Sequence, residues 1–166
     1  MNELHETESL TIRIDYLANH ADGIPALAAA RYEHWRVIYE QRGISREDLI
    51  LRLRKHAQTE AMPLAVVALH ENRTVGSASI LPHDLDPRPD LTPWLGGVFV
   101  LPAFRGQGIA TRLVERILGE ARRLRLPHLY LWTTTSVALY ARLGWSRFEQ
   151  MEYCGRTIQL MYRTID

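Results

Sequence analysis

The segment from residue 98 to residue 111 constrains the fold of this chain more than any other part of the sequence. An apolar run, Val98-Phe99-Val100, leads into a turn with glycine at positions 106 and 108, and a helical pattern begins at Ile109. Glycine has no Cβ, so the backbone of such a turn can approach a ligand closely. The first N–H groups of the helix lack partners within the helix and lie at its positive end. A strand, a tight turn and a helix start therefore predict an anion site, and a pyrophosphate is its natural guest.

The helix that follows this turn has one apolar face. Its apolar residues fall at steps of three and four, and Pro127 ends the pattern. The apolar positions are Ile109, Ala110, Leu113, Val114, Ile117, Leu118, Ala121 and Leu124. The opposite face carries Arg112, Glu115, Arg116, Glu120 and Arg123. A helix of this kind buries its apolar stripe against another element, and a sheet is the partner that the flanking strands offer.

Shorter patterns on both sides of this segment predict one sheet with helices. Strands are expected over 12–17, 64–69, 74–81, 94–100, 129–133, 145–151 and 157–163, and helices over 25–43, from 45 onward, from 108 to before 127, and over 136–143. Pro25 suits a first helical turn, Ser45 and Ser136 suit N-caps, and Gly144 suits a C-cap. Four prolines make 82–93 a loop. The expected order β-α-α-β-β-β-α-β-α-β-β gives a mixed α+β fold with one central sheet.

The composition is that of an ordinary globular chain. Of the 166 residues, 46% are hydrophobic and 23% are charged, which fits one domain over 1–166 with its own core and excludes a disordered chain. The formal net charge of +1 provides no overall field for nucleic acid or an anionic membrane, so neither partner is expected. The single cysteine, Cys154, excludes an intramolecular disulfide and a Cys-rich zinc site. The histidines show no metal-ligand spacing, and we expect no metal.

The N-terminal segment gives an expectation about location. It has neither a basic n-region nor an apolar h-region, so it does not have the pattern of a signal peptide. The most apolar window, 94–104, is too short for a membrane helix, which needs about 20 residues. We therefore expect a cytoplasmic protein with a flexible N-terminus over 1–11. The sequence does not fix the oligomeric state, and a homodimer is compatible with it.

Three kinds of phosphate site can use such a glycine turn. A Walker-type loop needs Gly-Lys-Ser/Thr where this chain has Gly108-Ile109-Ala110. A Rossmann fingerprint needs Gly or Ala at the place of Thr111 and a carboxylate about 20 residues later, and no carboxylate stands near residue 128. The third pattern, Arg-x-x-Gly-x-Ala, is filled by Arg105, Gly108 and Ala110. On this short pattern alone, a turn that only joins a strand to a helix stays an equal alternative.

Two longer motifs resemble those of the GNAT superfamily, the acyl-CoA-dependent N-acyltransferases. The first is Val98-x-Val100-x-Pro102-x-x-Arg105-Gly106-x-Gly108-Ile109-Ala110-x-x-Leu113, which resembles the pyrophosphate-binding motif of the family. The second is Ala138-Leu139-Tyr140-Ala141-Arg142-Leu143-Gly144-Trp145, which resembles its Ala-Leu-Tyr-x-x-x-Gly-Phe-type segment. A helix and a strand separate the motifs, as in the family. The resemblance covers about 12–163 and is strongest over 94–145.

The resemblance implies a mostly antiparallel sheet flanked by helices and a site for acetyl-CoA as co-substrate. In the family, the motif strand bulges and splays from the next strand, which opens a V-shaped cleft for the thioester. Its main chain bonds the pantetheine arm, and the N–H groups of the turn wrap the pyrophosphate. The cofactor-binding residues implied are Val98, Phe99, Val100, Arg105, Gly106, Gln107, Gly108, Ile109, Ala110 and Thr111.

Tyr140 is the catalytic residue that the resemblance implies, with its hydroxyl directed at the departing thiolate. A phenol of pKa about 10 can protonate a thiolate whose conjugate acid lies near 8.5, provided that the two are held close together. Without the flanking motif, Tyr140 would be interpreted as a helix aromatic that packs on the sheet.

The chain departs from the family pattern at two places. Thr133 stands where family members often have Asn, so Thr133 and its neighbour Thr134 are expected only as hydroxyl contacts to the cofactor. Some members carry Glu on the motif strand, where this chain has Leu95, Gly96 and Gly97, and the glycine pair would leave space for a bulky acceptor. A general base must then come from elsewhere. The candidates are His34, His83, Asp84, Asp86 and Asp90, or a relayed water, and each of these side chains is also typical of a solvated residue.

Taken together, the sequence predicts an acetyl-CoA-dependent N-acetyltransferase that acts on a primary amine of a small molecule or peptide by direct attack in a ternary complex. The acidic loop with Asp84, Asp86 and Asp90 slightly favours a cationic acceptor. A CoA-binding sensor without turnover stays open, because the family Asn and the strand carboxylate are absent. A nucleotide-binding domain that uses the same glycine turn is the third alternative.

Overall fold

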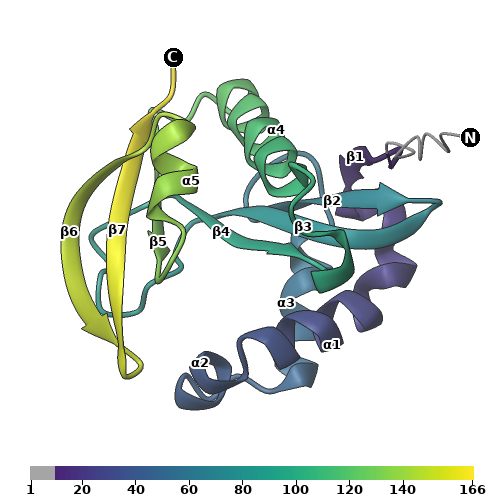
Figure 1. The fold of residues 1–166 in the computed structure, drawn as a ribbon, viewed down its shortest axis with the longest axis horizontal. Helices are drawn as coiled ribbons and strands as arrows, with labels where there is room; N and C mark the ends of the chain where they lie inside the picture. Colours follow the sequence, from purple (N-terminus) through teal and green to yellow (C-terminus); the bar gives the residue numbers. More distant parts are fainter. Residues whose placement is uncertain (1–9) are drawn as a thin grey trace, which may run out of the picture.

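A seven-stranded sheet in the order β1-β2-β3-β4-β5-β7-β6 organises residues 10–166, the part of the chain that the computed structural model describes (Figure 1). The strands are β1 Arg13–Tyr16, β2 Leu64–His70, β3 Arg73–Leu81, β4 Trp94–Val100, β5 His128–Thr133, β6 Ser146–Tyr153 and β7 Arg156–Thr164. The helices are η1 Leu17–Gly23, α1 Ile24–His34, α2 Arg36–Gln41, α3 Arg46–His56, η2 Pro102–Phe104, α4 Ile109–Arg123 and α5 Val137–Arg142. Neighbouring strands run antiparallel except β4 and β5, so the expected α+β class and mostly antiparallel sheet are confirmed.

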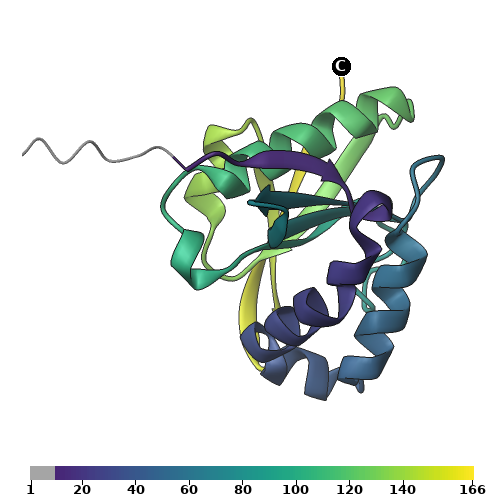
Figure 2. The same cartoon turned by 90° about the vertical axis from the view of Figure 1, so that its right-hand side faces the viewer.

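Helices cover both faces of the sheet. In Figure 2, α4 lies along one face, and α1 and α3 lie against the other. Strand β2 shows why the two cores form, because alternate side chains of a strand point to opposite faces. Leu64, Val66 and Ala68 pack in the cluster that contains the apolar face of α4, whereas Val67 and Leu69 pack in the cluster with α1 and α3. The sequence therefore fills both faces of one strand with apolar side chains.

The predicted helix over 25–43 is wrong in its continuity. Trp35, with φ −111° and ψ 28°, divides it into α1 and α2. The Trp35 ring packs against Phe99 of β4 at 5.8 Å and edge-on to Tyr39 at 6.4 Å. The break thus lies where the Trp35 ring contacts β4. Pairwise contacts across the molecule produce this break, and no local signal such as proline or glycine marks it.

The ends of α3 and α5 test the helix caps that the sequence predicts. Ser45 forms the expected cap, because its hydroxyl accepts from the Asp48 N–H and the Asp48 carboxylate accepts from the Ser45 N–H. Ser136 stands at the N-cap position of α5, but the expected side-chain cap is wrong. The hydroxyl of Thr133 instead accepts a hydrogen bond from the Ser136 N–H at 3.0 Å. Gly144 follows α5 with φ +89°, as its C-cap role requires.

The 3₁₀ segment η1 was not expected from the sequence. The Asp15 carboxylate accepts hydrogen bonds from the Tyr16 N–H and the Asn19 amide, and it pairs with His20 at 2.9 Å. Such local side-chain bonds favour a turn over a regular helix. Asp15 followed by Asn19 and His20 is the signal that could have revealed it.

The proline-rich loop 82–93 is held firmly against the sheet. Leu85 and Leu91 pack with Trp94, Ile158 and Leu160 in a third apolar cluster. This anchorage fixes the loop, which carries three acidic side chains.

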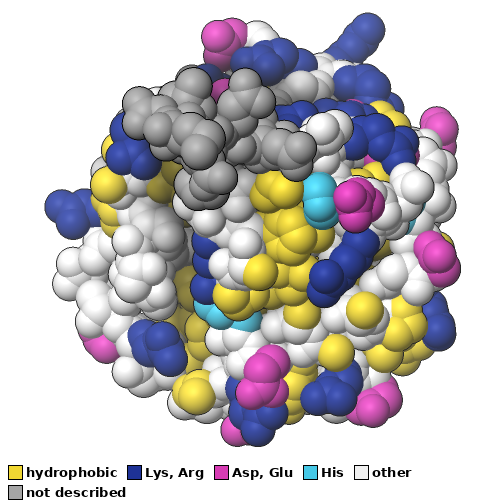
Figure 3. Space-filling model, turned by 45° about the vertical axis from the view of Figure 1, so that its right-hand side comes forward, with side chains coloured by type: hydrophobic (Ala, Val, Ile, Leu, Met, Phe, Trp, Pro, Cys, Tyr) yellow, Lys and Arg dark blue, Asp and Glu magenta, His cyan; other side chains and the backbone are white. Residues whose placement is uncertain are grey.

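The surface carries no uniform charge on the face drawn in Figure 3, where basic and acidic side chains are intermixed with apolar ones. Over residues 10–166, no helix is both long enough and apolar enough to cross a bilayer. The expectation of a flexible N-terminus falls mainly on residues 1–9, which lie outside the described residues.

Candidate functional site

Strand β4 bulges and then parts from β5. Ser77 of β3 pairs with Phe99 and Ser79 pairs with Gly96, so β4 contains one extra residue over this stretch. Gly97 has φ +61°, and its carbonyl accepts a hydrogen bond from the Ser77 hydroxyl at 3.0 Å. Strands β4 and β5 pair at one position alone within the described residues, Trp94 with Tyr130. The bulge and the splay have the form that the resemblance implied.

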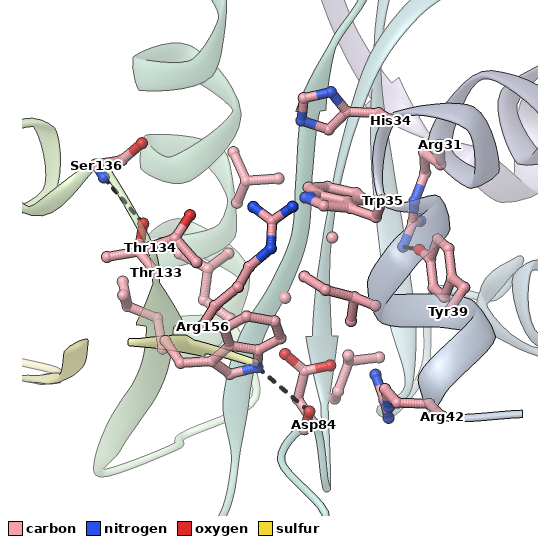
Figure 4. Close-up of a pocket in the computed structure, with 18 of the residues that line it drawn as sticks. Arg31, His34, Trp35, Tyr39, Arg42, Asp84, Thr133, Thr134, Ser136 and Arg156 are labelled. Carbon is pink, nitrogen blue, oxygen red and sulfur yellow. Dashed lines mark hydrogen bonds between the residues drawn. The ribbon is translucent and has the colours of Figure 1, made fainter. Parts of the chain in front are cut away.

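Two cavities lie along this opening. The first, here called the strand cleft, lies between β4 and β5 and has a volume of 390 Å³ (Figure 4). The second, here called the turn groove, follows residues 98–111 and has a volume of 550 Å³. Both volumes are typical of ligand sites. The residues that line both cavities are His34, Val98, Thr135, Ser136 and Tyr140. A ligand that occupies the groove can therefore reach into the cleft past Val98 and Tyr140.

Most of the predicted cofactor residues line the turn groove. They are Val98, Phe99, Val100, Arg105, Gly106, Gly108, Ile109, Ala110 and Thr111. The Phe99 and Ile109 side chains are buried in the core, so these residues offer the groove mainly backbone. Gln107 is exposed and does not line it, and Thr133 and Thr134 line the strand cleft instead. Sequence reasoning missed Thr135, Leu139 and Arg142, which also line the groove and flank the second motif.

The turn itself has the geometry of an anion-binding loop. Gly106 and Gly108 have φ +76° and +77°, and a Cβ added at either would meet no atom within 4 Å. The surroundings would leave room for a side chain, so it is the left-handed backbone that requires glycine at both positions. The Arg105 side chain folds back, with its Nε donating to the Val100 carbonyl at 2.9 Å and its guanidinium 5.9 Å from the Phe99 ring. Arg105 thus also fixes the turn on β4.

Tyr140 lies at the junction of the two cavities. Its side chain is 7% exposed, and its ring packs edge-on to Trp145 with 6.2 Å between the centroids. Burial raises the pKa of the Tyr140 hydroxyl to about 12. The hydroxyl is therefore a neutral proton donor throughout the ordinary pH range. A phenol of ordinary pKa would lose its proton near pH 10, and at Tyr140 this loss moves to about pH 12.

Only two of the five candidate bases line a cavity. Asp86 pairs with Arg42 at 3.4 Å, Asp90 pairs with Arg88 at 3.0 Å, and His83 is exposed outside both cavities. His34 lines both cavities, and partial burial and the nearby Arg105 charge lower its pKa, which keeps the ring neutral near pH 7.

Asp84 is the second candidate base, and it lies at the floor of the strand cleft. The Trp132 indole donates to its main-chain carbonyl at 3.3 Å (Figure 4). Burial raises the pKa of the Asp84 carboxyl to about 6, against the opposing effect of Arg42 and Arg31. A carboxyl of this pKa is ionised at pH 7, yet it binds a proton more strongly than an exposed aspartate does.

The expectation that Gly96 and Gly97 leave free space is wrong. A Cβ at Gly96 would lie 2.8 Å from Leu81 Cδ1 and 2.9 Å from Asp84 Oδ2. A Cβ at Gly97 would lie 2.7 Å from Arg31 Nη2. The side chains that take up this space come from α1, the end of β3 and the loop 82–93. The glycine pair therefore lets the Asp84 carboxylate and the Arg31 guanidinium, which come from other segments, lie against the bulged strand.

A bulged, splayed strand that leads into an open glycine turn defines the class of CoA-dependent acyltransferase folds that the motifs resemble. The comparison with protein families agrees, because residues 27–145 match the model of the acetyltransferase (GNAT) family. The chain belongs to this family. No curated protein sequence matches it significantly.

Solved structures share the fold at low sequence identity. The ribosomal-protein-alanine N-acetyltransferase of Brucella melitensis is 22% identical over 93% of this chain and 99% of its own, with a TM-score of 0.72. YncA of Salmonella typhimurium, solved with its cofactor acetyl-CoA, is 21% identical over 96% and 95%, with a TM-score of 0.70. N-acetylglutamate synthase of Neisseria gonorrhoeae, solved with coenzyme A and N-acetyl-glutamate, is 19% identical over 94% of this chain, with a TM-score of 0.66. This chain spans only 35% of that protein.

Proposed function

We propose that this protein transfers an acetyl group from acetyl-CoA to a primary amine by direct attack in a ternary complex. The observation that carries the proposal is the meeting of the turn groove and the strand cleft at Val98 and Tyr140. A thioester at this junction would face an amine that enters through the cleft. Holding the two reactants together supplies a large part of the rate acceleration.

The turn groove would hold the cofactor. The free N–H groups at the start of α4 and the positive end of its dipole favour a pyrophosphate, and Arg105 adds a charge. The main chain of the bulged β4 would bond the pantetheine arm. One of its N–H groups would polarise the thioester carbonyl, and a preorganised donor of this kind contributes roughly 3 kcal/mol.

In the reaction, the amine nitrogen forms a bond to the acetyl carbon and the carbon–sulfur bond breaks. One proton leaves the nitrogen, and one proton reaches the departing thiolate. We assign the second proton to Tyr140, because its hydroxyl is protonated at neutral pH and the residue lines both cavities at their junction. We assign the first proton to Asp84, because its carboxyl lies beside the bulge and has a pKa of about 6. His34 is the alternative acceptor, since it lines both cavities.

The Tyr140→Phe variant tests this function. It keeps the ring and the contact with Trp145, so acetyl-CoA should bind with an unchanged dissociation constant. We expect turnover to fall by about 10²–10⁴-fold, because only the proton donor is lost. Calorimetry measures the binding, and release of free thiol measures the turnover.

Three results of the same assays contradict the proposal. Wild-type turnover by the Tyr140→Phe protein would return Tyr140 to a packing role. Tight acetyl-CoA binding with no thiol release from any amine would favour the sensor. Binding of ATP in place of acetyl-CoA would favour the nucleotide-binding alternative.

A further inference from the structure

Arg31 is a buried cation with no hydrogen-bonded or ion-paired carboxylate among the described residues, and Asp84 acts on it only at longer range. Its side chain is 7% exposed, and its Nε and Nη1 have no hydrogen-bond partner among the described residues. Nη2 donates to the Tyr39 hydroxyl at a long 3.4 Å. A buried guanidinium normally has a carboxylate or phosphate partner, because leaving its donors unpaired is costly. Arg31 lines the strand cleft, so a ligand there can supply the missing anion.

Apart from the longer-range attraction of Asp84, the surroundings of Arg31 do not explain its placement. The guanidinium lies 5.7 Å from the centre of the Trp35 ring, and the residue belongs to the last turn of α1, where a cation is mildly favoured. Neither interaction satisfies the Nε and Nη1 donors. Gly97, with its left-handed φ, lies directly against Nη2. The guanidinium therefore lies in the strand cleft beside Gly97, the residue before Val98.

The strand cleft as a whole carries excess positive charge. Four arginines line it, Arg31, Arg42, Arg52 and Arg156, and Asp84 is the single acidic residue among the described residues that do so. Arg42 already pairs with Asp86. In Figure 4 the Arg156 side chain reaches into the cleft from β7, toward Trp35. A polyamine or another acceptor with several positive charges would meet repulsion here, since like charges at close range are unfavourable.

Asp84 and Arg31 flank the same bulge, one beside Gly96 and the other beside Gly97. They offer an acceptor for an ammonium group and a fork of donors for a carboxylate, next to adjacent residues of the strand. Resting on the function proposed above, we propose that the acceptor is a free amino acid. Its amino group lies at Asp84 and its carboxylate at Arg31. This assignment replaces the cationic acceptor expected from the acidic loop, since two of the three loop acids are paired with arginine.

The test compares amines that differ in the carboxylate. Thiol release from acetyl-CoA is measured with each common amino acid, with its carboxamide, with spermidine and with an aminoglycoside. We expect at least one free amino acid to be the best acceptor. Its carboxamide should show a kcat/KM at least tenfold lower, because a charge-assisted pair of bonds to Arg31 is lost.

The Arg31→Met variant assigns the effect to this side chain. It should lower the ratio of kcat/KM for the free amino acid to kcat/KM for its carboxamide by about tenfold to hundredfold, so that the two substrates become nearly equal. Arg31→Lys keeps the charge and should recover part of the loss. Arg54→Gln is the matched control, because Arg54 is an exposed arginine of α3 outside the cleft.

Each remaining result has a defined meaning. If acetyl-CoA binds and spermidine or the aminoglycoside is the best acceptor, the acetyltransferase function holds and the amino-acid acceptor is wrong. The amino-acid acceptor is equally wrong if the carboxamide equals the free acid. If Arg31→Met unfolds, the wild-type ratio of acid to carboxamide still decides. If the protein does not bind acetyl-CoA in calorimetry, the proposed function itself fails. Amino-acid binding to the wild type, measured by thermal shift, then supports or overturns the Arg31 site separately.

Discussion

Two pairs of glycines in one strand–turn–helix segment have opposite surroundings. At Gly106 and Gly108, a Cβ would meet no atom of the chain within 4 Å. At Gly96 and Gly97, a Cβ would press within 3 Å of Leu81, Asp84 and Arg31. The first pair shapes the backbone next to open space, and the second pair gives its space to side chains from other segments. Glycine content alone therefore does not distinguish a binding turn from a packing site.

This difference assigns the two ends of the site to different ligands. The open pair belongs to the groove that would take the cofactor, and the occupied pair belongs to the cleft that would take the acceptor. Substitutions in the first pair should then affect cofactor binding, and substitutions in the second pair should affect turnover.

The largest effect is expected at Gly108. We expect Gly108→Val to weaken acetyl-CoA binding more than about 100-fold, because a branched side chain would stand between the pyrophosphate and the N–H groups of α4. The left-handed φ of +77° also costs about 1–2 kcal/mol of folding free energy for a non-glycine residue. Calorimetry and thermal unfolding measure the two effects separately.

Gly43 provides the matched control for the Gly108 variant. It has φ +69° and the same open surroundings, but it lies outside both cavities. Gly43→Val should show the same loss of stability with acetyl-CoA affinity unchanged. Equal affinity in the Gly108→Val and wild-type proteins would remove the turn from the cofactor site.

A smaller effect of a different kind is expected at Gly96. Its φ is not left-handed, so Gly96→Ala adds no backbone strain, and the new Cβ, at 2.8 Å and 2.9 Å, forces the ends of Leu81 and Asp84 to move. We expect turnover to fall by about tenfold, since small displacements of reacting groups are costly. Acetyl-CoA affinity should stay within about threefold, as calorimetry would show. An equal loss of turnover and of acetyl-CoA affinity would contradict the separation of the cofactor end from the acceptor end of the site.

The two glycine pairs also mark how far the sequence could predict this molecule. The turn is a local object, made of consecutive residues with their own backbone requirements, so the spacing of Arg105, Gly106 and Gly108 predicts it, although only the longer motifs favour a ligand site over a linking turn. All seven strands were expected within a few residues, because alternating or continuous apolar runs define them locally. Family resemblance added the roles of Val98 and Tyr140.

The strand cleft could not be predicted in this way. Arg31 and Asp84 are 53 positions apart in the sequence and meet β4 only after the break at Trp35 and the anchoring of the loop by Leu85 and Leu91. These are contacts between distant segments, for which a single sequence carries no period or motif. The same limit explains why the acidic loop, considered alone, favours a cationic acceptor, since the pairing of Asp86 and Asp90 with arginines is visible only in the fold.

The smallest expected effect is a gain of stability on removing the Asp84 charge. The folded-state pKa of about 6 lies above the ordinary 3.8, so the folded protein binds this proton more strongly than the unfolded chain does. The ionised carboxylate therefore destabilises the fold, fully above pH 6 and no longer once the pH falls below 3.8. Full burial would make this destabilisation about 3 kcal/mol, and contact with the open cleft reduces it to about 1 kcal/mol.

Asp84→Asn should thus raise the free energy of unfolding at about pH 8 by about 1 kcal/mol and leave it unchanged at about pH 3.5, while turnover falls. Asp86→Asn is the control, because that exposed carboxylate lies outside the cleft and should give no gain. A lower melting temperature for Asp84→Asn at the higher pH would contradict this prediction. It would mean that the Asp84 charge stabilises the fold by holding Arg42 and Arg31 in place.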